Sequence, residues 1–429
     1  MKRQPIDLHL TAAVRDATGV RARPGLVAVA RGRVVWAGHP DHLPSRLRKQ
    51  SRVVEHPTTL LMPAFVNAHA HLDLTSLGPR ACPDTFTDWI RGVIRDRPTE
   101  TLDVVASVRQ GLRRARDAGV GYLGDIAGSA QAVHARRTAP QELLLPGVSY
   151  LECFGIGEGE AEAARQIKTR LGELPFETPI PGHDRGIVLG IAPHAPYSTG
   201  LAVYDAAARL SQDRAYRVST HLAEAPEEIA FVRDAAGPLA DLLRELGKWD
   251  ASIEPTGKHP VDHLEPALRR ARWLVVHANY LEDSHLPLLR KAGASVVYCP
   301  VASDYFGHTG HRYRELLDAG VNVCLGTDSI LCQPADPPDG QPLGILGQMR
   351  HLYRRDGADP ELLLKMATTN GLLALEFDQR DASLHEGAPA RFATVEIDPE
   401  SRTDPLEQIL TGNQPAAGLD LTGAERDQE

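Results

Sequence analysis

The clearest pattern along the chain is a series of short apolar runs that alternate with amphipathic segments. Continuous apolar runs are typical of parallel strands buried on both faces. The amphipathic segment Thr101–Ala118 carries apolar residues at three- and four-residue spacing, which predicts a helix that ends before Gly119. Eight such runs alternating with helices predict a parallel (β/α)₈ TIM barrel. The runs are Leu61–Asn67, Val120–Gly124, Leu143–Leu151, Gly186–Ala192, Tyr216–Thr220, Arg272–Val276, Ala294–Tyr298 and Val321–Gly326.

Both ends of the chain have a different pattern, which is typical of antiparallel strands. Leu26–Ala30 and Val34–Ala37 flank the tight turn Arg31-Gly32-Arg33, so we expect a hairpin there. Near the other end, Arg391–Ile397 shows a two-residue alternation, in which Phe392, Thr394 and Glu396 alternate with Ala393, Val395 and Ile397. The two ends of the chain are therefore predicted to be β structure, outside the barrel.

A doubly wound open sheet is the main alternative for the central region. Such a sheet normally carries a glycine-rich phosphate-binding loop after its first strand, and the segment Asn67–His71 contains no glycine. The glycine cluster Gly155-x-Gly157-x-Gly159 follows the third predicted strand and lacks the acidic residue expected downstream. We therefore interpret it as a flexible barrel loop.

Composition narrows the class of protein. The 429 residues are 42% hydrophobic and 24% charged, which excludes a disordered or fibrous protein. With 47 basic and 56 acidic side chains the net charge is −9, so a nucleic-acid binder is not expected. Five cysteines without a C-x-x-C pair favour a reducing compartment. No signal peptide or apolar run of about 18 residues is present, so we expect a soluble, cytoplasmic protein without membrane contact.

Chemically active residues stand where the predicted strands end. A barrel concentrates function at the carboxyl ends of its strands. Five of the eight predicted strands lead directly into such a residue. They are His69 with His71 in strand one, His194 after strand four, His221 after strand five, His277 after strand six, and Asp328 after strand eight.

Four of these residues form a plausible set of metal ligands. Alternate residues of a strand point to the same side, so His69 and His71 can both face the barrel mouth. With His221 and Asp328 they supply the nitrogen and oxygen donors that suit Zn²⁺. The alternative is that they are surface or capping histidines, which their shared placement disfavours. All seven lysines lie away from the strand ends, so a lysine-bridged metal pair is not expected and one metal ion is predicted.

Two further residues are candidates for proton transfer. Glu224 lies three residues past His221 and can take a proton from water on the metal and pass it to a leaving group. Its alternative role is that of a first-turn helix glutamate, which is our interpretation of Glu227 and Glu228. His277 can hydrogen-bond the hydroxide or a developing oxyanion. No H-E-x-x-H, G-x-S-x-G, P-loop or catalytic Cys–His signature is present.

The motifs around these residues resemble the amidohydrolase superfamily, in its branch of mononuclear metal-dependent deaminases and chlorohydrolases. Val27–Gly38 and Gly387–Val395 also resemble that family's composite β-sandwich domain. The resemblance implies a sandwich built from residues 1–62 and 381–429, the latter ending in the polar tail Thr422–Glu429, around a barrel at 63–380. The matching motifs are Met62–Leu72, Pro193–Ser198, His221–Glu224, Val276–Tyr280 and Leu325–Ser329.

The resemblance also implies roles and a reaction. His69, His71, His221 and Asp328 would hold one divalent metal ion, Zn²⁺ or alternatively Fe²⁺. Glu224 and His277 would transfer protons and orient water, Asp328 would also accept a proton, and His194 would contact the substrate. The implied reaction is the attack of a metal-activated hydroxide on a ring carbon, with release of ammonia.

Within that branch the chain is most similar to deaminases of aminodeoxyfutalosine and related adenosine-type nucleosides. The similarity lies in Phe86–Ile94, Tyr305–His308 and Tyr313–Leu317. The stretch Cys299–Asp304 lacks the Ser-Asn usual after Cys-Pro, and Ala390-Arg391-Phe392 replaces the family's Ala-Asp-Phe. We expect an aminohydrolase acting on a purine nucleoside or related amino-heterocycle, a small-molecule substrate, and a homodimer. The alternatives are a chlorohydrolase or other C–N bond hydrolase, and a non-catalytic scaffold.

Overall fold

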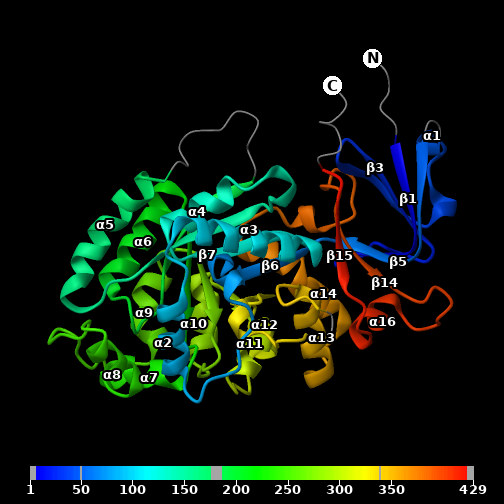
Figure 1. Cartoon of the computed structure of the whole chain (residues 1–429). Coiled ribbons are helices and arrows are strands. Elements are labelled where there is room, and N and C mark those ends of the chain that lie inside the picture. The colour runs from blue at the N-terminus through cyan, green and yellow to red at the C-terminus, as the bar shows by residue number, and fades with distance from the viewer. Residues whose placement is uncertain (1–5, 49–50, 175–185, 338–339, 423–429) are drawn as a thin grey trace. The chain divides into compact units, whose positions relative to one another are not determined.

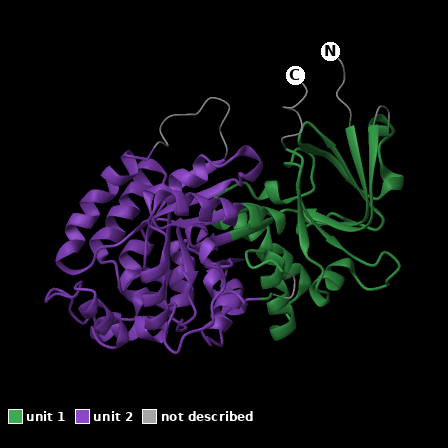
Figure 2. Cartoon of the chain, viewed as in Figure 1, with its two compact units in different colours: residues 1–67, 113–122, 336–429 green, residues 68–112, 123–335 purple. Residues whose placement is uncertain are grey.

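The computed structural model describes residues 6–48, 51–174, 186–337 and 340–422. The chain forms two compact units, one of residues 1–67, 113–122 and 336–429 and the other of residues 68–112 and 123–335 (Figure 2). Apart from Thr422, the predicted polar tail lies outside the described residues. Among the described residues, no helix is long and apolar enough to cross a membrane.

Eight strands form the predicted barrel sheet, in which β6 to β13 are neighbours in chain order, and Figure 1 shows helices around this sheet. A parallel bridge between Ala70 and Asp328 joins the two ends of this sheet and nearly closes the ring. The prediction of a (β/α)₈ barrel is therefore confirmed. The strands are β6 (Phe65–Ala70), β7 (Val120–Ala127), β8 (Gly147–Cys153), β9 (Ile187–Pro193), β10 (Arg217–Leu222), β11 (Trp273–His277), β12 (Ser295–Tyr298) and β13 (Asn322–Leu325).

Burial explains why these segments become strands. Every residue of β7, β8 and β11 is buried, as the continuous apolar runs predicted. The third strand is displaced from its predicted position at residues 143–151, because Gln141–Leu143 forms a 3₁₀ turn. Pro146 follows this turn and has no N–H to donate to a neighbouring strand. The strand therefore begins at Gly147 and ends at Cys153.

Helices cover the outside of the barrel strands. Helices α4 and α5 contact β8, and α6 contacts β9 and β10. The predicted helix at residues 101–118 is α3, and Gly119 follows it at φ 76°. The helices are α1 (Ser45–Arg48), α2 (Phe86–Asp96), α3 (Thr101–Asp117), α4 (Ala130–Arg137), α5 (Glu160–Gly172), α6 (Leu201–Arg214), α7 (Pro226–Asp234), α8 (Pro238–Glu245), α9 (Pro260–Leu268), α10 (His285–Ala292), α11 (Pro300–Tyr305), α12 (Tyr313–Asp318), α13 (Ile345–Asp356), α14 (Pro360–Ala367), α15 (Thr369–Ala374) and α16 (Pro405–Thr411).

A second sheet combines strands from both ends of the chain, as the composite β domain requires. Its order is β15-β14-β5-β1-β3-β4, with β2 paired to β1. The predicted hairpin joins β3 to β4, and Arg31 and Gly32 both have positive φ, 53° and 66°, as a type I′ turn demands. The strands are β1 (Ile6–Arg15), β2 (Arg21–Ala22), β3 (Gly25–Ala30), β4 (Arg33–Gly38), β5 (Ser51–Pro63), β14 (Arg391–Glu396) and β15 (Ala416–Asp420).

Candidate active site

The predicted metal ligands meet at one end of the barrel. His69 lies in β6, His71 follows that strand, His221 lies in β10, and Asp328 follows β13. All four residues are buried. The backbone N–H of Asp328 donates to the carbonyl of His69 at 3.0 Å. The main chain thereby holds the first and last strands together beside the candidate ligands.

Their side chains approach one another in two overlapping groups that share His69: one is His69, His71 and Asp328, and the other is His69, His221 and His277. Asp328 Oδ1 lies 3.4 Å from Nε2 of His69 and 3.4 Å from Nε2 of His71. The rings of His69 and His221 are 5.1 Å apart. Nδ1 of His221 donates to the carbonyl of His194 at 3.0 Å, because a carbonyl only accepts, and the lone pair therefore resides on Nε2. The cluster can hold a divalent metal ion.

Electrostatics prepare the four residues for a cation. Burial lowers the pKa of His69 and, with the neighbouring imidazoles, holds that of His221 well below its ordinary value. Burial alone would raise the pKa of Asp328, but hydrogen bonds to His69 and His71 hold it well below its usual range. Burial also opposes the charged form of His71, yet Asp328 raises that pKa. The Asp328 carboxylate therefore favours positive charge beside it, as a bound cation would supply.

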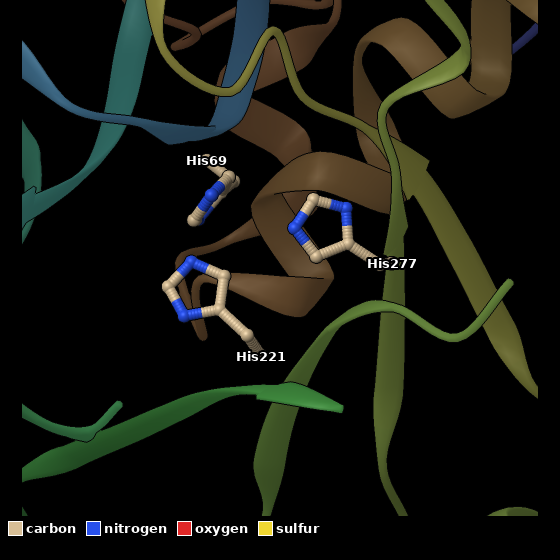
Figure 3. A group of neighbouring side chains, drawn as sticks. All are labelled: His69, His221 and His277. Carbon is tan, nitrogen blue, oxygen red and sulfur yellow. The ribbon is translucent and has the colours of Figure 1, made fainter. Parts of the chain in front are cut away.

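His277 joins the same cluster, and Figure 3 shows its ring facing His69 and His221. Burial lowers the pKa of His277 to about 3, so its ring is neutral. Its Nε2 lies 3.4 Å from Glu224 Oε1. Because this nitrogen is near both the cluster and Glu224, it can act either as a further donor to a cation or as a hydrogen-bonding partner of a bound water.

Glu224 is a buried carboxyl group beside that cluster. Burial raises its pKa well above the ordinary value, and the charges of Asp328, Glu228 and Glu227 raise it further. A raised pKa favours the protonated form of the carboxyl group, which suits it to general acid catalysis. The structure places this carboxyl group next to His277, and the proton-transfer role of Glu224 stays a prediction.

Strained backbone marks the same end of the barrel. Among the described residues, eight residues other than glycine have positive φ. Four of them stand at strand ends around the cluster: Ala223 at 51°, His277 at 70°, Ala278 at 53° and Asp328 at 59°. Such conformations cost free energy and occur mainly where function requires a particular side-chain direction.

A second group of charged residues, which the sequence did not reveal, lies beside His194. Arg97 forms ion pairs of 3.0 Å with both Asp73 and Glu152. Glu152 Oε1 lies 4.0 Å from Nε2 of His194, and Nδ1 of that histidine bonds Ser198 Oγ at 2.6 Å. Glu152 stands at the end of β8, so its strand-end position was the available signal. Nothing in the local pattern of Arg97 indicates its two partners.

The cluster lies at the base of a cavity of about 420 Å³. His71, His194, His221, Glu224 and Asp328 form part of its polar lining. Much of the remaining lining consists of apolar side chains of α2 and α8, together with Tyr197, and Phe86 packs against both Tyr197 and Phe306. The apolar wall residues of these two helices are Trp89, Ile90, Val93, Leu239, Leu242 and Leu243. A cavity of this size and lining suits a ligand of drug-like dimensions.

Comparisons with known proteins agree with this geometry. An aminodeoxyfutalosine deaminase of Deinococcus radiodurans is 28% identical over 363 residues, which cover 81% of this chain and 80% of that protein. Among solved structures, an aminofutalosine deaminase of Helicobacter pylori in complex with methylthio-coformycin has a TM-score of 0.78 at 19% identity, covering 95% of both chains. An adenosine deaminase of Xanthomonas campestris with bound zinc has a TM-score of 0.72 at 20% identity, covering 96% of this chain and 90% of the other.

Residues 60–420 match the family model described as the amidohydrolase family, so the chain belongs to the amidohydrolase family. Within it, the protein is a deaminase-type hydrolase that acts on carbon–nitrogen bonds other than peptide bonds.

Proposed function

We propose that this protein is a zinc-dependent aminohydrolase that releases ammonia from a purine nucleoside. The observation that carries the proposal is the buried set of imidazoles around His69, with the Asp328 carboxylate, beside Glu224, a carboxyl group whose pKa is raised by burial. A scaffold protein has no physical need for this combination, because buried polar groups without partners cost free energy.

The proposed metal ligands are His69, His71, His221 and Asp328. Three nitrogen donors and one carboxylate oxygen match the preference of Zn²⁺, and Fe²⁺ is the alternative that such a donor set also accommodates. A zinc ion bound there would supply Lewis-acid activation of water at neutral pH. His277 is proposed to orient the attacking water rather than to bind the metal, because its Nε2 already lies 3.4 Å from Glu224.

Proton movements follow from the charges of the side chains. Glu224 holds a proton on its carboxyl group and would donate it to the ring nitrogen next to the carbon under attack. Asp328 is ionised and would accept the proton lost by the water. Asp328 would then pass this proton to the amino group, which leaves as ammonia, and the remaining hydroxyl proton would return to Glu224 as the ring carbonyl forms. His194 borders the same cavity and would contact the sugar or base of the substrate.

The substrate class is inferred from the cavity. Its apolar wall on α2 and α8 extends beyond the cluster, which favours a nucleoside with a large, weakly polar substituent over a free base. The similarity to the aminodeoxyfutalosine deaminase of Deinococcus radiodurans supports aminodeoxyfutalosine as the first substrate to test.

The test combines metal analysis with ammonia release. We expect about one zinc per chain and ammonia release from at least one member of a panel of aminodeoxyfutalosine, adenosine, S-adenosylhomocysteine and guanine. Glu224→Gln should keep the metal and lose activity. Protein without stoichiometric metal, or a variant as active as the wild type, would contradict the proposal. Chloride release from a chlorotriazine, without ammonia release from the panel, would favour the chlorohydrolase alternative.

A further inference from the structure

The turn that presents Glu224 has an unusual backbone. It runs from the end of β10 at Leu222 to the start of α7 at Pro226, and Ala223 within it has φ 51°. An alanine in this left-handed region is strained by roughly 1 kcal/mol or more. The turn therefore needs other groups to hold it, and Glu224 projects from its middle.

Glu228 holds the two N–H groups of this turn. Its Oε1 accepts from the N–H of Ala223 at 2.8 Å, and its Oε2 accepts from the N–H of Glu224 at 2.9 Å. The residue is completely buried, with 0% of its surface exposed. A first-turn glutamate usually reaches back to the N-cap N–H alone, whereas this one bonds the two residues that precede Ala225, the N-cap of α7.

The carbonyl groups of the turn are held from the neighbouring strand end. The carbonyl of Ala223 accepts from the backbone N–H groups of Asn279 and Tyr280, at 3.0 and 3.2 Å. The carbonyl of Glu224 accepts from Nδ2 of Asn279 at 2.9 Å, and Oδ1 of that asparagine accepts from Ser303 Oγ at 2.8 Å. All four backbone polar groups of residues 223 and 224 thus have partners within the chain.

We infer that Glu228, together with Asn279 and Ser303, is a clamp that positions the Glu224 carboxyl group for proton transfer. Glu228 does not line the cavity itself and reaches Glu224 only through a backbone N–H, so it is a positioning residue and not a catalytic one. The inference that this matters for catalysis rests on the proposed deaminase activity. Glu228 does lie in the first turn of α7, as the sequence predicted, and the inference adds a second role to that position.

The physical reason is that Glu224 is joined directly to the clamped peptide groups. A glutamine at position 228 offers one acceptor oxygen, and its NH₂ group would face the second backbone N–H. One buried N–H would then lack a partner, and the strained turn would relax. A displacement of about 1 Å at a proton donor is enough to slow a reaction by about a hundredfold.

The chain offers a matched control at the adjacent residue. Glu227 also lies in the first turn of α7, and its charge, like that of Glu228, raises the pKa of Glu224. Replacing it by glutamine removes a similar charge and leaves the clamp intact. A difference between Glu228→Gln and Glu227→Gln therefore reports on the clamp and not on the lost charge.

The experiment compares the two variants in full-length, zinc-loaded protein. Hydrogen exchange at the amides of residues 223 and 224 should be at least about tenfold faster in Glu228→Gln and unchanged in Glu227→Gln. Zinc content should equal that of the wild type in both. With the most active panel substrate, Glu228→Gln should lower kcat by about 10- to 100-fold and change KM by less than about threefold.

Hydrogen exchange tests whether the clamp holds the turn, and kcat tests whether the clamp matters for catalysis. Unchanged exchange in Glu228→Gln overturns the clamp, and faster exchange with unaltered kcat overturns its catalytic role. If Glu228→Gln does not fold, Ser303→Ala takes its place, with an expected loss of about three- to tenfold in kcat, and an unchanged kcat there overturns the inference. A wild type that is inactive on the whole panel overturns the proposed function before any variant is compared.

Discussion

Replacing Arg97 by methionine should destabilise the protein strongly, because this side chain neutralises two buried carboxylates. The side chains of Asp73 and Glu152 are only 3% and 2% exposed, and each lies 3.0 Å from the guanidinium. Breaking a buried ion pair by removing one partner typically costs about 3–5 kcal/mol. We expect a loss in this range at pH 7.5, although Arg97 itself is 22% exposed and part of its charge is screened by water.

The loss of folding free energy in Arg97→Met should increase as pH rises. Burial opposes ionisation of Glu152, but the charge of Arg97 holds the pKa of Glu152 below its ordinary value of 4.5. Without Arg97, burial dominates and the folded-state pKa rises above the unfolded-state value. An acid with a raised folded-state pKa makes the protein less stable as pH rises between the two pKa values. The deficit of Arg97→Met should therefore grow by about 1.4 kcal/mol per pH unit above pH 4.5 until Glu152 is fully ionised.

Urea unfolding between pH 5 and pH 8, at constant free zinc, measures this deficit. The double variant Arg97→Met, Glu152→Gln should recover part of the lost stability and remove much of the pH dependence. Arg95→Met is the control, because Arg95 belongs to the same helix and is 72% exposed, so its loss should stay below about 0.5 kcal/mol. A deficit that is independent of pH, or no recovery in the double variant, would refute the reasoning.

Three further predictions concern the site. Glu224→Gln should retain zinc and lose about 10²- to 10⁴-fold in kcat, which steady-state ammonia release measures; an equal loss of zinc would show that Glu224 serves the metal instead. Asp328→Ala should lose stoichiometric zinc, which metal analysis measures. In the wild type, zinc at about 1,000 times its Kd should stabilise the fold by about 4 kcal/mol relative to chelated protein. Calorimetry with and without chelator measures this difference, and equal stability in both would contradict it. Leu243→Ala should reduce kcat/KM by about 5- to 30-fold for nucleosides with an apolar 5′ substituent and by less than about twofold for adenosine. Equal losses on both substrates would show that these apolar residues do not select the substrate.

The barrel was predictable because burial on both faces leaves a continuous apolar signal in each strand. Six strands lie close to their predicted positions. The first begins at Phe65 rather than Leu61, because Leu61–Pro63 belongs to β5, and the third was misplaced because Leu143–Leu145 is apolar without being a strand. Leu143 and Leu145 are buried although residues Gln141–Leu143 form a 3₁₀ turn and not a strand. Apolar character reports burial, and only backbone pairing distinguishes a strand from a buried turn.

The candidate ligands were predictable from their place at the strand ends, since the barrel brings all those ends together. The supporting residues were not. Arg97 follows α2, and its partners Asp73 and Glu152 lie in other segments, so no periodicity links the three. Glu228 has the sequence signature of an ordinary helix start, and its bonds to the preceding turn depend on the left-handed conformation of Ala223. Such pairings arise from loop geometry, which local sequence does not encode.

The bridge between Ala70 and Asp328 has a consequence for the order of folding and metal loading. Two of the candidate ligands, His69 and Asp328, come from opposite ends of the barrel sequence and meet only where the last strand joins the first. A nascent chain emerges from the ribosome in sequence order, so a partly synthesised chain carries the His69-x-His71 pair long before it has the carboxylate. If the proposed ligand set is right, a metal ion would be captured at full affinity only after strand β13 has docked, and metal loading would be a late event of folding rather than a nucleus for it.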